Sequence, residues 1–154
     1  MAHALRIAVA LATLSGAAAF AQSWPAAQRL AETTLARHPE AAHVVLHVTP
    51  PGAADSENLV IGSTIGRLGK KADEDDLRIM HEAHTETVVA KSGDRFNVSL
   101  PLIDGQGKVI GIVAIGFAYK AGDDKAPLLA DAERIRDELR RDGVDARALF
   151  AAAP

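Results

Sequence analysis

The sequence predicts an α+β domain in which helices pack on a five-stranded antiparallel sheet. Short stretches rich in β-branched residues occur as a group of two and a group of three, and turn residues separate the strands of each group. Stretches with helical periodicity lie before, between and after these groups. The resulting order, α-β-β-α-β-β-β-α, favours hairpin-linked strands with covering helices over alternating βαβ units.

Residues 1–21 have the pattern of a secretory signal peptide. Arg6 gives a positive start, residues 7–14 are almost wholly apolar, and Ala19-Phe20-Ala21 forms an A-x-A cleavage site before Gln22. A membrane anchor is the alternative, but the stretch is alanine-rich and shorter than the roughly 20 strongly apolar residues that a span needs. We therefore expect residues 22–154 to form a single domain that is periplasmic or secreted.

The composition excludes several classes of protein. The chain of 154 residues contains no cysteine, so neither a disulfide framework nor thiol chemistry is expected. The net charge is −3 and only 4% of the residues are aromatic, which argues against a nucleic-acid partner.

Three helices are expected. The first covers Trp24–His38, with Ser23 as its cap and Pro39 beyond its end. The second starts at the acidic run Asp73–Asp76 and continues to about His84. The third is opened by Asp123-Asp124 and ended by Gly143, with one more helical turn possible in the tail. The expected strands are 42–49, 58–63, 86–91, 94–100 and 109–119.

The strand at residues 109–119 is expected at the centre of the sheet because it shows little polar alternation. It carries Gly111 and Gly116, and a glycine inside a strand typically marks a bulge or the close approach of another group. A central strand with open space on one face can form part of a ligand pocket.

The end of the sheet resembles a known family. Pro101-Leu102, the turn Asp104–Gly107 and the strand containing Ile110-Gly111 are similar to the corresponding hairpin of extracytoplasmic PAS-like sensor domains of the Cache or PDC type, and the order of elements over residues 24–141 agrees. The resemblance implies a PAS-like sheet, a small-molecule ligand and a role in signal transduction. Family members usually feed a membrane-bound output domain, whereas this chain resembles the sensor part alone, so a membrane-bound signalling protein is the implied partner.

Five histidines follow the leader, which raises the question of metal or haem. His43 and His47 share one face of a strand but lie ~13 Å apart along it, so edge or surface positions are favoured. His81 and His84 have helical i, i+3 spacing and are close enough to share a metal. Their string is not HExxH and no third ligand is identifiable, so solvated residues at the end of a helix are favoured.

No catalytic motif is present. The sequence lacks a G-x-S-x-G elbow, a phosphate loop and a dinucleotide fingerprint. We therefore expect neither an enzyme nor a cofactor.

For a ligand site, the resemblance implies the side of the sheet that faces residues 62–86. Alternation places Arg95, Asn97 and Ser99 on one face of their strand, where Arg95 can pair with a carboxylate. Arg78, His81 and His84 complete the predicted set. Arg67, Lys70 and Lys71 add positive charge, while Asp73–Asp76 are expected to face solvent, so a small carboxylate is favoured over an amine.

The sequence leaves two main hypotheses open. One is a binding module that holds a small polar ligand. The other is an accessory module that docks on another protein without a ligand, and histidine-based binding of metal or haem is a variant. A concave site with convergent polar groups would favour the first. A contiguous exposed apolar patch would favour the second.

Overall fold

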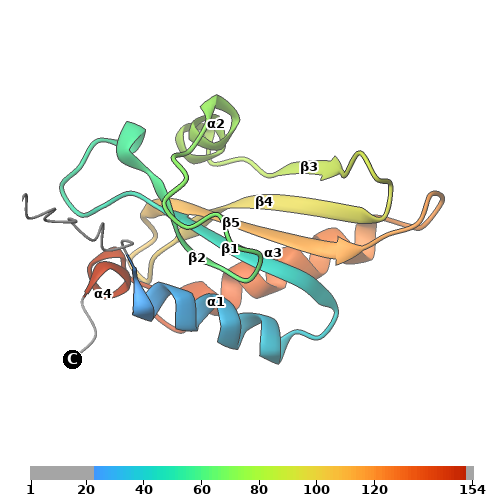
Figure 1. Cartoon of the computed structure of the whole chain (residues 1–154), viewed down its shortest axis with the longest axis horizontal. Coiled ribbons are helices and arrows are strands. Elements are labelled where there is room, and N and C mark those ends of the chain that lie inside the picture. The colour runs from blue at the N-terminus through green and yellow to red at the C-terminus, as the bar shows by residue number, and fades with distance from the viewer. Residues whose placement is uncertain (1–22, 152–154) are drawn as a thin grey trace, which may run out of the picture.

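A computed structural model describes residues 23–151 of the chain (Figure 1). The signal-peptide prediction falls on residues 1–21, outside the described part. The elements are α1 (Pro25–Arg37), β1 (Ala41–Val48), η1 (Asp55–Glu57), β2 (Leu59–Ser63), α2 (Glu74–Glu82), β3 (Glu86–Val89), β4 (Arg95–Ile103), β5 (Val109–Ala118), α3 (Ala126–Arg141) and α4 (Ala146–Phe150). No helix among residues 23–151 is long and apolar enough to cross a membrane.

The five strands form one sheet in the order β2-β1-β5-β4-β3, and every neighbouring pair is antiparallel. The predicted α+β class with a five-stranded antiparallel sheet is confirmed. The helices differ from the predicted set in one respect, the short 3-10 helix η1 before β2, and the further helical turn expected in the tail is α4. The centre of the sheet is β5, as its apolar composition predicts.

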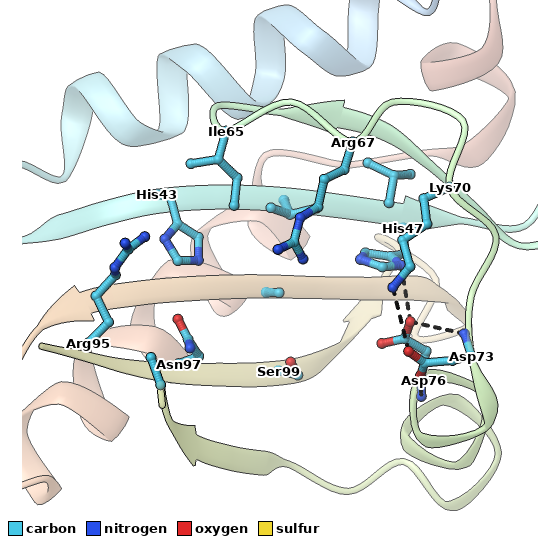
Figure 2. A pocket seen from close by; sticks show the side chains of 14 residues that line it. His43, His47, Ile65, Arg67, Lys70, Asp73, Asp76, Arg95, Asn97 and Ser99 are labelled. Atoms are coloured by element: carbon cyan, nitrogen blue, oxygen red, sulfur yellow. Dashed lines mark hydrogen bonds and ion pairs between the residues drawn. The ribbon is translucent and has the colours of Figure 1, made fainter. Parts of the chain in front are cut away.

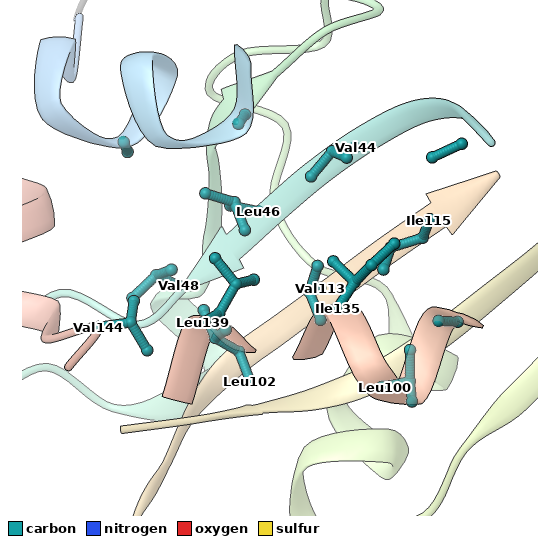
Figure 3. Packing of buried hydrophobic residues seen from close by; sticks show 14 of the residues in the cluster. Val44, Leu46, Val48, Leu100, Leu102, Val113, Ile115, Ile135, Leu139 and Val144 are labelled. Atoms are coloured by element: carbon teal, nitrogen blue, oxygen red, sulfur yellow. The ribbon is translucent and has the colours of Figure 1, made fainter. Parts of the chain in front are cut away.

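One face of the sheet is closed by α1, α3 and α4, which lie together below it in Figure 1. Figure 3 shows side chains of β1, β4 and β5 packed against α1 and α3. Fully buried members of this core include Leu46, Leu100, Ile115, Phe117 and Ile135. The core excludes water from this face and contributes most of the apolar burial that stabilises the domain.

The opposite face carries α2 and the segment before it. Ile79 and Met80 of α2 pack on Ile112 of β5, forming a second and much smaller apolar cluster. The helix begins with a capping box in which the Asp73 side chain accepts from the Asp76 amide and the Asp76 side chain accepts from the Asp73 amide. The acidic run is thus the start of a helix, as predicted. The helix α2 covers only one end of this face of the sheet.

Two local predictions at element ends are wrong. Ser23 does not cap α1, because the N-cap is Trp24 and no side chain caps it; the Trp24 ring instead packs edge-on against Phe150 of α4. Pro101 does not end its strand, because β4 continues to Ile103. A proline is tolerated there because β3 pairs only with residues 96–99, so one side of β4 has no partner strand at Pro101.

Gly111 lies in the central strand β5, between β1 and β4, as the sequence predicts. A Cβ at Gly111 would overlap the backbone carbonyl of His47 on β1. The group that comes close, as the sequence analysis expected at a strand glycine, is the backbone of the adjacent strand. The pairing of β4 with β5 also shifts register beside this residue, between Leu102 and Ile103. A close approach of two backbones therefore requires the glycine.

Candidate functional site

A pocket of about 410 Å³ lies on the face of the sheet opposite α1 and α3. Figure 2 shows side chains from β1, β4 and the segment between β2 and α2 pointing into the same space. Its lining consists of polar groups over a small apolar floor: His43, Val45, His47, Val60, Ile65, Arg67, Lys70, Asp73, Asp76, Ala90, Arg95, Asn97, Ser99 and Ala114.

The floor is hollow because the central strand carries small residues there. Gly116 of β5 is paired with His43 on one side and Asn97 on the other. Two residues earlier, Ala114 is paired with Val45 and Ser99. Since side chains two residues apart share a face, these two rows line the same side of the sheet. The His43 ring occupies the volume that a side chain at position 116 would need.

The upper wall is the loop of residues 64–73, which hydrogen bonds tie to the neighbouring strands. The Thr64 amide donates to the Val44 carbonyl at 3.0 Å, and the Val60 amide donates to the Lys70 carbonyl at 2.9 Å. Between these anchors Arg67 has a φ of 73°, in the left-handed region. That conformation costs a non-glycine residue about 1–2 kcal/mol, and such strain is found mainly at functional sites. The loop holds the Arg67 side chain over the pocket (Figure 2).

The prediction that His43 and His47 occupy edge or surface positions is wrong. Their strand β1 lies between β2 and β5, and the two residues are only 7% and 8% exposed. Both line the pocket. Three buried atoms of the lining have no hydrogen-bond partner among the described residues: Nδ1 of His43, Nδ1 of His47 and Oδ1 of Asn97. The Asp76 carboxylate lies 3.5 Å from Nδ1 of His47, whereas no carboxylate of the described part contacts the ring of His43. Buried polar atoms are normally paired, so the unpaired atoms mark a place where a ligand can bind.

Burial lowers the pKa of both pocket histidines from the ordinary value of 6.5. For His43 the positive charges of Arg95 and Arg67 lower the pKa further. For His47 the carboxylate of Asp76, whose oxygen lies 3.5 Å from Nδ1, opposes the effect of burial. Both rings are therefore neutral at pH 7, and the formal charge of the pocket comes from its other side chains.

The charged groups are distributed unevenly along the pocket. At one end Asp73 and Asp76 lie beside His47, and Nζ of Lys70 is 3.6 Å from the Asp73 carboxylate. At the other end Arg95 has only a 3.8 Å contact with Asp94. Arg67 projects between the two histidines (Figure 2) and makes no ion pair within the described part of the chain. The expectation that residues 73–76 all face solvent is wrong for Asp76, whose side chain is 17% exposed and lies against His47.

The structure separates the predicted site residues into two groups. Arg95, Asn97 and Ser99 line the pocket from β4, together with the cations Arg67 and Lys70. The other three residues lie outside the lining, each beside a carboxylate: Arg78 contacts Glu86 at 2.7 Å, His84 contacts Glu86 at 3.2 Å and His81 contacts Asp55 at 3.2 Å. No group of three metal-binding side chains forms among residues 23–151.

Sequence reasoning missed His43, His47 and Asp76 as lining residues. A signal for the histidines was present, since His43, Val45 and His47 alternate with the apolar residues Val44, Leu46 and Val48. The apolar set faces the core and the other set lines the pocket. The position of Asp76 depends on how α2 packs, which no local pattern reports.

Comparison of the chain with models of protein families and with curated proteins finds no match.

Proposed function

We propose that this chain is a periplasmic or secreted small-molecule-binding module of the PAS-like Cache or PDC type, and that its ligand is a small carboxylate. The observation that carries the proposal is the pocket, where Arg67 and Arg95 project beside the buried Nδ1 atom of His43, which has no hydrogen-bond partner among the described residues. The predicted order of strands and the hairpin turn at Asp104 support the family resemblance.

A carboxylate suits this end of the pocket on charge and on hydrogen bonding. A guanidinium group offers parallel N–H donors in the geometry that a carboxylate accepts. The Asn97 amide and the Ser99 hydroxyl are further donors on the same face. An amine would meet two arginines of which only Arg95 has an acidic neighbour, Asp94 at 3.8 Å, so a carboxylate is favoured there.

The surface argues against the alternative of a ligand-free docking module. The large exposed apolar residues of the described part are Ile65, Leu68 and Val88. Ile65 and Leu68 lie on the loop over the pocket, whereas Val88 lies on the edge strand β3. Scattered exposed apolar residues are normal for a protein surface. The pocket, in contrast, has the concave form and the convergent polar groups of a ligand site.

The test is calorimetric titration of formate, acetate, propionate, lactate and succinate into the exported protein and two variants. Arg95→Ala removes a pocket cation, while Arg78→Ala is a matched control because its side chain is equally exposed, at 46% against 47%, but lies outside the lining. We expect at least one carboxylate to bind, with binding weakened at least tenfold in Arg95→Ala and unchanged in Arg78→Ala.

Absence of binding across the panel, or equal effects of the two substitutions, would contradict the proposal. A thermal-shift measurement with the same compounds gives an independent readout, since a ligand at 100 times its Kd stabilises a protein by about 2.7 kcal/mol. Binding of amines or divalent metals alone would overturn the ligand class.

The proposed location and partner require separate tests. If the leader is cleaved, mass spectrometry of the exported protein will show a chain beginning at Gln22. An intact Met1 in the membrane fraction would contradict export with cleavage. A membrane-bound signalling protein is the proposed partner, and crosslinking in cells with and without the bound carboxylate would identify it.

A further inference from the structure

The position of His43 bears on how the pocket responds to pH. Its ring lies over Gly116, between the side chains of Arg95 and Arg67 (Figure 2). The residue is 7% exposed, and its Nδ1 atom has no hydrogen-bond partner among residues 23–151. The ring is thus buried, polar and unpaired, and it is placed where the proposed carboxylate would bind.

The charged groups that face His43 are both cations. Arg95 comes from β4 and Arg67 from the loop of residues 64–73. The central strand β5 presents Gly116 and Ala114 on this face, and β2 contributes Ser63 near by, so neither neighbouring strand adds a titratable group there. On β1 itself the next residue of this face that titrates is His47, which lies at the opposite end beside Asp76.

We propose that His43 contacts the bound anion and takes up one proton when the anion binds, so that the affinity of the pocket rises as pH falls. This inference rests on the proposed function, because it needs an anion at the arginine end of the pocket. The proton comes from solvent and is added to a ring nitrogen of His43. No other covalent bond changes.

The physical reason is a change in the electrostatic environment of the ring. In the free pocket, burial and two nearby guanidinium groups favour neutral His43, as the lowered pKa indicates. A bound carboxylate offsets the positive charge of Arg67 and Arg95 and supplies an acceptor for a ring N–H. Both effects favour the imidazolium form, and linkage then requires that protonation of the ring strengthens anion binding.

His47 is an internal control for this inference. It is buried to the same extent as His43, but Asp76 already supplies a carboxylate 3.5 Å from its Nδ1. An anion beside Arg95 changes the surroundings of His43 more than those of His47, because the charge of Arg95 lowers the pKa of His43 alone, whereas the charge of Arg67 lowers the pKa of both rings. Titration of both rings in one sample distinguishes a local effect from a general effect of pH on the domain.

The experiment uses acetate as the probe and the exported protein. NMR follows the ring C–H resonances of His43 and His47 between about pH 5.5 and 8, the range in which histidine titrates, with sodium acetate or with sodium chloride at the same concentration. We expect acetate to raise the titration midpoint of His43 and to leave that of His47 nearly unchanged. The acetate affinity should rise by up to about tenfold per pH unit as pH falls through this window.

Calorimetry in buffers with different ionisation enthalpies measures the number of protons taken up with acetate. We expect proton uptake in the wild type and in His47→Gln, and none in His43→Gln. The NMR titration of the wild type needs no substitution and therefore decides the question even if a variant fails to fold.

Two negative outcomes have different meanings. If acetate perturbs Ser99, Ala114 and Asn97 while the midpoint of His43 stays fixed and no proton is taken up, this inference is overturned and the proposed carboxylate site stands. If acetate and the wider carboxylate panel perturb no pocket residue, both the inference and the proposed function are overturned.

Discussion

The two faces of the sheet differ most clearly along β5, which contributes to both. On the closed face it carries Val113, Ile115 and Phe117, all fully buried in the main core. On the other face the alternate positions are Ala114 and Gly116, which leave the floor of the pocket hollow. A single strand thus provides bulky apolar side chains to the main core, whereas on the other face it leaves the floor of the pocket almost without side chains and provides one bulky residue, Ile112, under α2.

The closed face therefore contributes most of the stability, and the pocket face contributes the proposed binding site. The closed face buries large apolar groups, which is the main source of folding free energy. The pocket face instead contains buried polar atoms without partners and a loop residue in a strained backbone conformation, both of which are destabilising. Substitutions on the closed face should therefore mainly reduce stability. Substitutions on the pocket face should mainly reduce binding.

The largest expected effect is a loss of stability on the closed face. Phe117→Ala should lower the free energy of unfolding by about 3–5 kcal/mol, because it removes a fully buried aromatic ring and leaves a cavity. Ser99→Ala on the pocket face should change it by no more than about 0.5 kcal/mol. Urea denaturation measures both values, and similar losses would show that the pocket face also forms part of a tightly packed core.

A pair of glycine substitutions compares the two faces within β5. Gly111→Val should destabilise by about 1–3 kcal/mol or more, because its side chain would overlap the His47 carbonyl on β1. Gly116→Val would meet the His43 ring instead. A side chain can turn away more easily than a strand, so we expect a smaller loss of stability in urea melts together with loss of carboxylate binding. A neutral Gly111→Val would contradict the close approach of the two strands.

Relief of backbone strain should separate stability from binding. Arg67→Gly removes a non-glycine residue from the left-handed region, and we expect stability to stay equal or to rise by up to about 1 kcal/mol. Ala83→Gly is the matched control, because Ala83 has a φ of 51° at the end of α2, away from the pocket lining.

Thermal melts and carboxylate titrations should show similar stability changes in these two variants but lost binding only in Arg67→Gly. Retention of full affinity in Arg67→Gly would remove Arg67 from the site.

The smallest expected effect is a pH dependence of stability. The pKa values of His43 and His47 are below 6.5 in the folded state, so the unfolded chain binds more protons as pH falls below that value. Stability is therefore fully present above about pH 6.5 and decreases as pH falls through the folded-state pKa values. Urea melts at a series of pH values should show a shallower decrease in His43→Gln. A stability that rises on acidification across this range would contradict the neutral state of the rings.

Sequence alone determined the elements and the class of the fold. Period-two and helical patterns, with turn residues such as Asp104, are local properties of the chain, and they predicted the five strands and three longer helices with small errors at the ends. The same alternation correctly grouped Arg95, Asn97 and Ser99 on one face. It did so because the geometry of a strand relates side chains at i and i+2 without any tertiary information.

Only the tertiary structure decided which side chains meet. The placement of β1 between β2 and β5 buries His43, which the sequence assigned to an edge or surface, and brings it opposite Gly116 and near Arg95. The packing of α2 places Asp76 against His47, although residues 47 and 76 are far apart in the chain. Strand order and helix docking depend on contacts between segments that are distant in the chain. Local periodicity does not predict those contacts.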